Sequence, residues 1–175
     1  MSLSRRSFLA TAGATLSTAA AANRFEGFHI GVTDWNLQQT GKLESVALAK
    51  SLGFDGVQIS PGRKPVNDKL PLDNAEVQAQ YLQHSRQEGI PLDGTCLDIL
   101  HVNYLKNDKL GQKWVADGIG VTKKLGVRVM LLPFFGKGAL TTRAEMDYVG
   151  DALKELAPEA EKAQVILGLS ASWTA

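Results

Sequence analysis

The stretch Val127-Arg128-Val129-Met130-Leu131-Leu132 decides the fold class of this chain. It is a short run of mostly apolar and β-branched residues, which is typical of a strand buried inside a sheet. Gly126 ends the helical pattern before it, and the run opens into the loop Pro133-Phe134-Phe135-Gly136-Lys137-Gly138. A buried strand placed between a helix and a loop of this kind is typical of an α/β protein.

The same pattern repeats on both sides of this stretch. Apolar runs predict strands over 28–33, 56–60, 92–97, 127–132 and 165–169. Helical spacing of apolar residues predicts helices that end at Gly53, near Gly89 and at Gly126, and a last one that passes Ala160. Asp73 or Asn74 is expected to cap the second helix and Thr141 or Thr142 the fourth, in which Pro158 predicts a kink or a break.

Strands that alternate with helices at this spacing indicate βα units and a parallel sheet. Two architectures fit the pattern. A doubly wound sheet can be complete with five strands, whereas a (β/α)₈ barrel needs about 250 residues. No GxGxxG motif follows the first strand, which weakens the dinucleotide-binding version of the doubly wound fold.

The composition limits which class of protein this can be and which kinds of partner it can bind. The 175 residues are 44% hydrophobic with a formal net charge of +1, which fits one globular domain with a sizeable core. The sequence lacks a stripe of basic residues with interleaved aromatics, which is the pattern that indicates nucleic-acid binding. We therefore expect small or neutral partners. The single cysteine, Cys96, excludes an internal disulfide and is expected to be a buried structural thiol.

The N-terminal segment predicts export. Ser4-Arg5-Arg6-Ser7-Phe8-Leu9 has the twin-arginine pattern, and a weakly hydrophobic stretch and small residues up to Ala22 follow it. We therefore expect a signal peptide over residues 1–22, a domain over 23–175, and a periplasmic or extracellular location. No other apolar run is long enough to span a bilayer after cleavage.

Four stretches resemble the xylose isomerase-like family of TIM barrels, which are sugar phosphate isomerases and epimerases. They are IGVTDWNL (30–37), AKSLGFDGVQIS (49–60), HSRQEGIPLDGTCLDILH (84–101) and KKLGVRVMLLPFFGKGAL (123–140). The resemblance runs over essentially all of residues 28–169. It implies an α/β fold of the (β/α) TIM-barrel type, truncated to about five of eight βα units, and a sugar (phosphate) isomerase or epimerase-like function.

The same resemblance implies a divalent metal, Mn, Mg or Zn, in the intact family. Relatives carry a glutamate ligand after the fifth strand, and the matching position here is Ser170, a poor ligand for a hard cation. The later ligands, an Asp, a His and a Glu, would lie beyond Ala175. We therefore expect either a truncated or frameshifted product or an incomplete gene model, and we expect the 175-residue chain to bind no metal and to be inactive alone. The alternative is an exported, non-catalytic carbohydrate-binding or scaffold protein that forms homo-oligomers through open barrel edges.

Polar groups directly after barrel strands face the catalytic end, which nominates Asp34, Ser60, Asp98 and His101. Asp98 and His101 are the candidate acid/base pair, because a spacing of three on a helical turn places them on one face. A local pair with only a structural role is the alternative.

Four further residues are candidates for substrate binding. Trp35 and Phe134 suit the apolar face of a sugar, or else plug the barrel mouth. Gln58 can donate to and accept from hydroxyls, or else is a satisfied core amide. Lys137 lies among glycines that would suit a phosphate group, although the GxxxxGK[ST] frame is absent and a tight loop also explains the glycines.

Overall fold

The computed structural model describes residues 28–171, and the predicted signal over residues 1–22 lies outside them. Within this range five strands alternate with four long helices, and two short 3₁₀ turns follow β3 and β4. The strands are β1 (Gly31–Thr33), β2 (Gly56–Ile59), β3 (Leu92–Cys96), β4 (Val129–Phe134) and β5 (Ile166–Ala171). The helices are α2 (Glu44–Ser51), α3 (Ala75–Glu88), α4 (Lys109–Lys124) and α5 (Arg143–Ala163), and the turns are η1 (Asp98–His101) and η2 (Gly136–Gly138).

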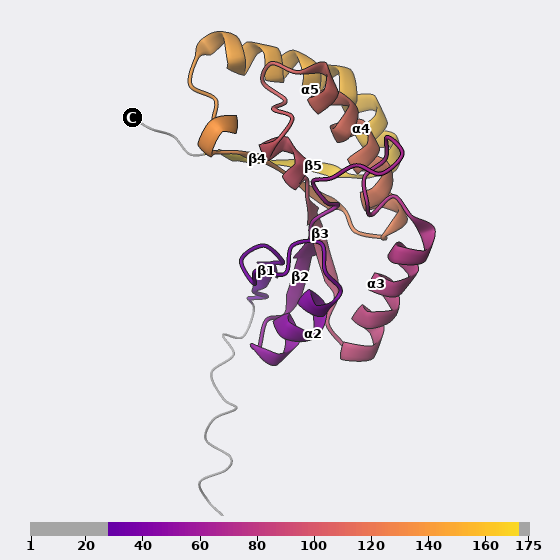
Figure 1. The fold of residues 1–175 in the computed structure, drawn as a ribbon. Helices are drawn as coiled ribbons and strands as arrows, with labels where there is room; N and C mark the ends of the chain where they lie inside the picture. The colour runs from indigo at the N-terminus through magenta and orange to yellow at the C-terminus, as the bar shows by residue number, and fades with distance from the viewer. Residues whose placement is uncertain (1–27, 172–175) are drawn as a thin grey trace, which may run out of the picture.

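The described sheet is parallel throughout, and its spatial order β1-β2-β3-β4-β5 is the order of the chain. A doubly wound sheet reverses its order at a switch point, whereas a barrel adds each strand beside the one before it. The helices accordingly follow one another around one side of the sheet (Figure 1). The predicted α/β fold of TIM-barrel type is confirmed, and the doubly wound alternative is wrong.

The helix ends confirm two of the capping predictions. The Asn74 side chain accepts hydrogen bonds at the start of α3, and Thr142 forms a capping box at the start of α5. Of the kink or break predicted at Pro158, the break is wrong, because α5 continues through it to Ala163. Leu156 and Ala160 are buried on either side of the proline, and packing of this face outweighs the one backbone hydrogen bond that proline removes.

The two faces of the sheet differ in what covers them. Met130, Leu132 and Phe134 of β4 point toward the helices and are buried in the core. The alternate residues point to the inner face, which would line the interior of a closed barrel. On this face a hollow of about 300 Å³ is lined by polar side chains together with Val129 of β4. The polar side chains are Thr33, Gln58 and Asp93.

A bulge in β3 turns Asp93 onto this inner face. Val57 of β2 pairs with Leu92 and the next residue pairs with Gly94, so Asp93 is the extra residue. A Cβ added to Gly31 would lie 1.9 Å from Asp93 Oδ2, and one added to Gly56 would lie 2.6 Å from it. Glycine at both positions therefore makes room for the carboxylate, whose pKa is raised by partial burial.

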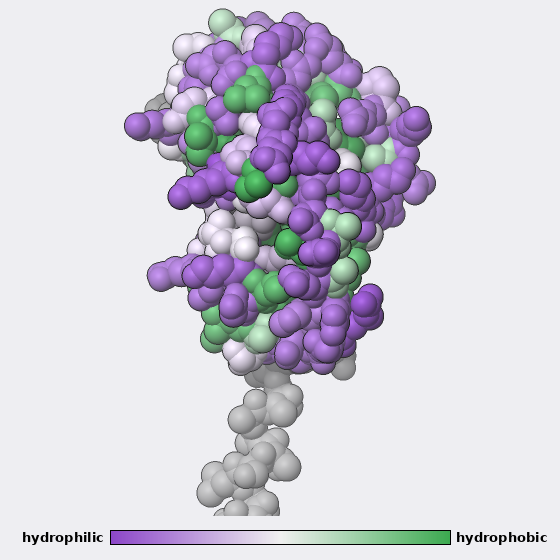
Figure 2. Space-filling model, turned by 45° about the vertical axis from the view of Figure 1, so that its right-hand side comes forward, coloured by the Kyte–Doolittle hydropathy of each residue, from purple (hydrophilic) through white to green (hydrophobic). Residues whose placement is uncertain are grey.

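On the face of the molecule drawn in Figure 2, hydrophilic side chains dominate and smaller apolar patches are scattered among them. Within residues 28–171 no helix combines the length and apolar character needed to cross a membrane. Cys96 is buried and unpaired, as predicted. Burial, together with the nearby carboxylates of Asp98 and Asp34, raises the pKa of its thiol to about 12.

Two glycines of α4 should respond to alanine with opposite signs. A Cβ at Gly111 would lie 2.8 Å from the Cα of Leu105, a backbone atom that cannot easily move, whereas a Cβ at Gly120 meets nothing within 4 Å. Gly111→Ala should therefore lower the free energy of unfolding by about 2 kcal/mol through overpacking. Gly120→Ala should raise it by about 1 kcal/mol, because alanine favours the helix. Urea denaturation of both variants measures this, and shifts of the same sign would contradict the packing described here.

Candidate functional site

Three aromatic rings meet at the carboxyl ends of the strands. They are Trp35 after β1, His101 at the end of η1, and Phe135 after β4, and we call them the aromatic cluster. The ring centroids of Trp35 and His101 lie 5.7 Å apart, those of Trp35 and Phe135 5.5 Å, and those of His101 and Phe135 4.9 Å. All three side chains are half-buried, so parts of the rings remain open to solvent.

Phe134, the predicted partner of Trp35, lies on the other face of β4. It is only 2% exposed and lines an apolar groove beside α5 together with Leu140, Met146 and Val149. Successive strand residues point to opposite faces, so Phe135 takes the place near Trp35 that we assigned to Phe134. The alternation of side chains along the strand could have shown that Phe134 faces the core. Met130 and Leu132 are buried core residues, and Phe134 points to the same side of the strand as they do.

A partly buried ion pair stands beside the aromatic cluster. Arg63 Nε donates to Asp98 Oδ2 at 3.0 Å, and the Asp98 side chain is fully buried while that of Arg63 is 43% exposed. Burial raises the pKa of Asp98 to about 6, although the charge and hydrogen bond of Arg63 oppose the shift. Arg63 lies on the loop after β2 and carried no sequence motif, so the sequence analysis missed it.

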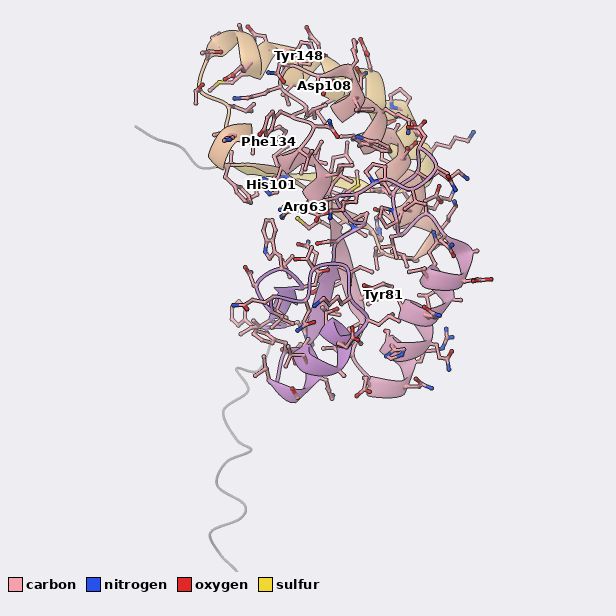
Figure 3. All side chains as sticks on the ribbon, in the orientation of Figure 1. Arg63, Tyr81, His101, Asp108, Phe134 and Tyr148 are labelled. Carbon is pink, nitrogen blue, oxygen red and sulfur yellow. The ribbon has the colours of Figure 1, made fainter. Side chains whose placement is uncertain are left out.

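Asp98 and His101 do not form the predicted acid/base pair within the described residues. The carboxylate of Asp98 bonds to Arg63, whereas the His101 ring packs on Trp35 and Phe135. Figure 3 shows Arg63 next to His101 at the centre of the molecule. Partial burial and the positive charge of Arg63 both lower the pKa of His101, which keeps its imidazole neutral at neutral pH.

The Asp34 side chain holds together the loop after β1, which carries Trp35, and the end of β2, which precedes Arg63. Its Oδ2 accepts hydrogen bonds from the backbone N–H of Gly41 at 2.8 Å and of Ser60 at 2.9 Å, and its Oδ1 accepts from Ser60 Oγ at 2.6 Å. Asp34 and Ser60 are both buried. The structure therefore gives Asp34 and Ser60 a positioning role, because they tie the loop after β1 to the end of β2.

The remaining two predicted residues lie elsewhere. Gln58 is on the inner face of the sheet, where its Oε1 accepts a hydrogen bond from Thr33 Oγ1 at 3.0 Å. Lys137 is exposed on the short turn η2. Gln58 is thus set below the aromatic cluster, inside the barrel-type sheet, rather than at the strand end where we expected it.

The described residues do not fit a divalent metal. Ser170 lies on the inner face of β5, because Leu169 points to the groove beside α5 and the next residue points the other way. In residues 28–171 there is no group of three or more His, Cys, Asp and Glu side chains that could hold a metal ion. A hydroxyl at this position does not supply the anionic oxygen that such a cation needs.

Residues 46–174 match the model of the family described as xylose isomerase-like TIM barrel. Three solved structures share the fold. D-psicose 3-epimerase from Clostridium cellulolyticum, solved with D-tagatose, has a TM-score of 0.60 at 16% identity over 80% of this chain and 51% of its own. D-allulose 3-epimerase from Methylomonas sp. in complex with D-allulose has a TM-score of 0.58 at 16% identity over 81% and 50%. A putative xylose isomerase from Rhodospirillum rubrum has a TM-score of 0.57 at 18% identity over 81% and 53%.

The chain spans about half the length of these solved structures. At such low identities the likeness concerns the fold alone. No curated protein matches the chain. The family assignment therefore rests on the match over residues 46–174, and the five strands found here correspond to part of the barrel of these epimerases.

Proposed function

Because the chain belongs to the xylose isomerase-like TIM barrel family, we propose that its aromatic cluster binds a small carbohydrate as part of a sugar isomerase or epimerase-like site. One observation carries the proposal: three aromatic rings at the carboxyl ends of the strands stand beside a guanidinium group held by a buried carboxylate. Carbohydrate sites combine an apolar platform for C–H groups with a few placed polar groups for hydroxyls.

Each group has a distinct part in this binding. The rings of Trp35 and Phe135 bury the apolar side of the sugar. Arg63 keeps N–H donors free after its Nε has bonded to Asp98, and these donate to sugar hydroxyls. His101 is neutral at neutral pH, so one ring nitrogen accepts and the other donates.

His101 remains the candidate for moving a proton, whereas Asp98 has a positioning role. His101 lies at the surface of the aromatic cluster, where it can exchange a proton with a bound hydroxyl. Asp98 acts through Arg63, whose guanidinium it orients. Residues 28–171 do not offer a fitting metal site, so we propose that the 175-residue chain by itself binds sugar without converting it. Gln58 and Lys137 stay predictions for contacts to a larger or phosphorylated sugar.

A matched pair of phenylalanine variants tests the site. D-allulose is a suitable probe because a structural relative was solved with it. Isothermal titration should show binding to the full chain that is weakened about tenfold by Phe135→Leu, since loss of one aromatic contact costs about 1 kcal/mol or more. Phe134→Leu should lower thermal stability but leave the affinity unchanged, because Phe134 lines the groove beside α5.

Added Mn²⁺ or EDTA should not change the D-allulose affinity of the 175-residue chain. The proposal is wrong if the wild-type chain gives no binding heat with D-allulose, or if the two phenylalanine variants lose affinity equally. Micromolar Mn²⁺ binding would show that our reading of Ser170 is wrong.

The edge strand β5 favours a second candidate function, that of a self-associating scaffold. Ile166 and Leu169 on β5 are 55% and 57% exposed, and an exposed apolar edge strand promotes pairing with another chain. Light scattering of the purified chain would separate a monomeric sugar binder from such an assembly. Export by the twin-arginine pathway to the periplasm or beyond remains a proposal that rests on the sequence of residues 1–22.

A further inference from the structure

Two loops connect the aromatic cluster to α4 and α5. The first loop, residues 102–108, follows His101 of η1 and leads into α4. The second loop, residues 135–142, begins with Phe135 and leads into α5. The helices α4 and α5 lie side by side (Figure 1), which brings the two loops together as well. The distance between the rings of His101 and Phe135 therefore depends on how these loops are held.

An ion pair ties the two loops to each other. Lys106 belongs to the first loop, and its Nζ lies 2.9 Å from Oε1 of Glu145 in the first turn of α5. The same Nζ donates a hydrogen bond to the carbonyl oxygen of Ala139 in the second loop at 2.8 Å. We call Lys106 and Glu145 the loop clamp, because together they join the first loop to the second loop and to α5.

The other oxygen of Glu145 fastens the end of the second loop. Glu145 Oε2 accepts hydrogen bonds from the backbone N–H of Thr141 at 2.7 Å, from Thr141 Oγ1 at 3.0 Å and from the backbone N–H of Thr142 at 3.0 Å. The hydrogen bond from Lys106, together with those from Thr141 and Thr142, holds the pKa of Glu145 at about 2. The carboxylate is therefore charged over the whole pH range in which a histidine titrates.

Low exposure distinguishes the loop clamp from the ion pairs on the surface. The side chains of Lys106 and Glu145 are 12% and 22% exposed, whereas those of Lys154 and Asp151, a surface pair on α5, are 81% and 72% exposed. Exposed pairs contribute little, because water and salt screen their attraction and both side chains lose freedom when they pair. A pair that is mostly removed from water is screened less, so it can hold two segments at a fixed distance.

Close packing at Gly138 supports the same arrangement. Gly138 of the second loop is buried, and a Cβ added to it would lie 3.3 Å from Cδ1 of Tyr104 and 3.5 Å from the carbonyl oxygen of Leu100. The backbone N–H of Gly138 donates to the carbonyl oxygen of Phe135 at 3.1 Å. The first loop and η1 thus contact the second loop close to the residue that carries the Phe135 ring.

We propose that the loop clamp positions Phe135 against His101, so that the aromatic cluster is already formed before a sugar binds. The consequence for binding rests on the sugar site proposed above. The ring centroids of His101 and Phe135 lie 4.9 Å apart although the two residues come from different loops. Loops and side chains that become ordered only on binding lower the affinity, and a cluster that is already ordered avoids this loss. Lys106 and Glu145 are positioning residues, since neither belongs to the aromatic cluster.

Lys106→Met in the full chain tests the proposal, because methionine keeps most of the apolar stem and removes the charge. The affinity for D-allulose, measured by isothermal titration, should fall about three- to tenfold, since the rings would have to be ordered by the ligand. Lys154→Met is the matched control. It breaks the exposed pair with Asp151 on α5 and should leave the affinity unchanged.

A titration of His101 followed by nuclear magnetic resonance gives a second measurement, which needs no ligand. In the wild type, burial and the charge of Arg63 lower the pKa of His101. In Lys106→Met this pKa should rise toward the ordinary value of 6.5, because a displaced Phe135 ring admits water to the imidazole. An ion pair that only stabilised the fold would leave the pKa of His101 in the folded chain unchanged. His29 and His84 lie outside the aromatic cluster and serve as internal references.

Glu145→Gln breaks the loop clamp from the side of α5. The amide keeps an acceptor oxygen for Thr141 and Thr142, so the end of the second loop stays fastened, but the charge that holds Lys106 is lost. This variant should reproduce both effects of Lys106→Met. Agreement between the two variants excludes a purely local change in the first loop, and Glu145→Gln keeps the test decisive if Lys106→Met does not fold.

The proposal is overturned if Lys106→Met and Glu145→Gln leave the pKa of His101 where Lys154→Met leaves it. It is also overturned if the wild type binds D-allulose and these two variants bind it equally well. Failure of the sugar site is a different result, because a wild type that gives no binding heat with D-allulose overturns the proposed function while the titration of His101 still decides on the loop clamp.

Discussion

Asp34→Ala is expected to lower the free energy of unfolding by about 4 kcal/mol, because hydrogen bonds to a charged group contribute about 1.5–3 kcal/mol each. The carboxylate accepts from Gly41 N, Ser60 N and Ser60 Oγ, and the site is fully buried. Alanine would leave three donors without their acceptor and a void where the carboxylate stood. Urea denaturation followed by circular dichroism measures the loss.

Asp151→Ala is the control for this prediction. Asp151 is 72% exposed and pairs with Lys154 on the surface of α5, so its removal should cost no more than about 0.5 kcal/mol. The loss of unfolding free energy in Asp34→Asn should fall between the losses in Asp34→Ala and Asp151→Ala. The amide keeps one acceptor oxygen but turns its NH₂ toward a backbone or hydroxyl donor. Equal stability of Asp34→Ala and wild type would contradict the positioning role that we assign to Asp34.

Asp98 should make the chain less stable as the pH rises from about 4 to about 6. Its pKa moves from 3.8 in the unfolded chain to about 6 in the fold, mainly because burial disfavours the charge. Over this interval the folded state binds more protons than the unfolded state, so the free energy of unfolding falls with rising pH. A pKa shift of this size corresponds to about 3 kcal/mol of unfolding free energy, and all of this contribution is lost once the pH is above the pKa of the folded state.

Asp98→Asn removes the titrating group while keeping the shape of the side chain. Its stability should not show the fall between about pH 4 and pH 6, and at neutral pH it should match or exceed that of wild type. Arg63 would lose its partner but remains hydrated, since its side chain is 43% exposed. The difference between variant and wild type is the quantity to measure, because the carboxylates remote from Asp98 contribute equally to both. A difference that is independent of pH would contradict the raised pKa.

The candidate site shows which residues can be predicted from their position directly after a strand and which cannot. The rule that polar and aromatic residues after barrel strands gather at one end predicted that Trp35 and His101 lie together, and their ring centroids are 5.7 Å apart. It did not select between Phe134 and Phe135, because adjacent residues share composition and differ only in the face to which they point. Nor could it find Arg63, whose role depends on a loop that returns to β3 from 35 residues earlier.

Local pattern by itself determined the order of helices and strands and the parallel βα character of the sheet. It narrowed each of two helix caps to a pair of neighbouring residues, of which the structure shows Asn74 and Thr142 as the caps. These follow from periodicity and capping, which act within a few residues. Only the tertiary structure decided that the strands keep the order of the chain and that Asp98 bonds to Arg63 rather than to His101. Those outcomes depend on contacts between residues far apart in the chain, whose pairing is set by packing of the whole sheet and its helices.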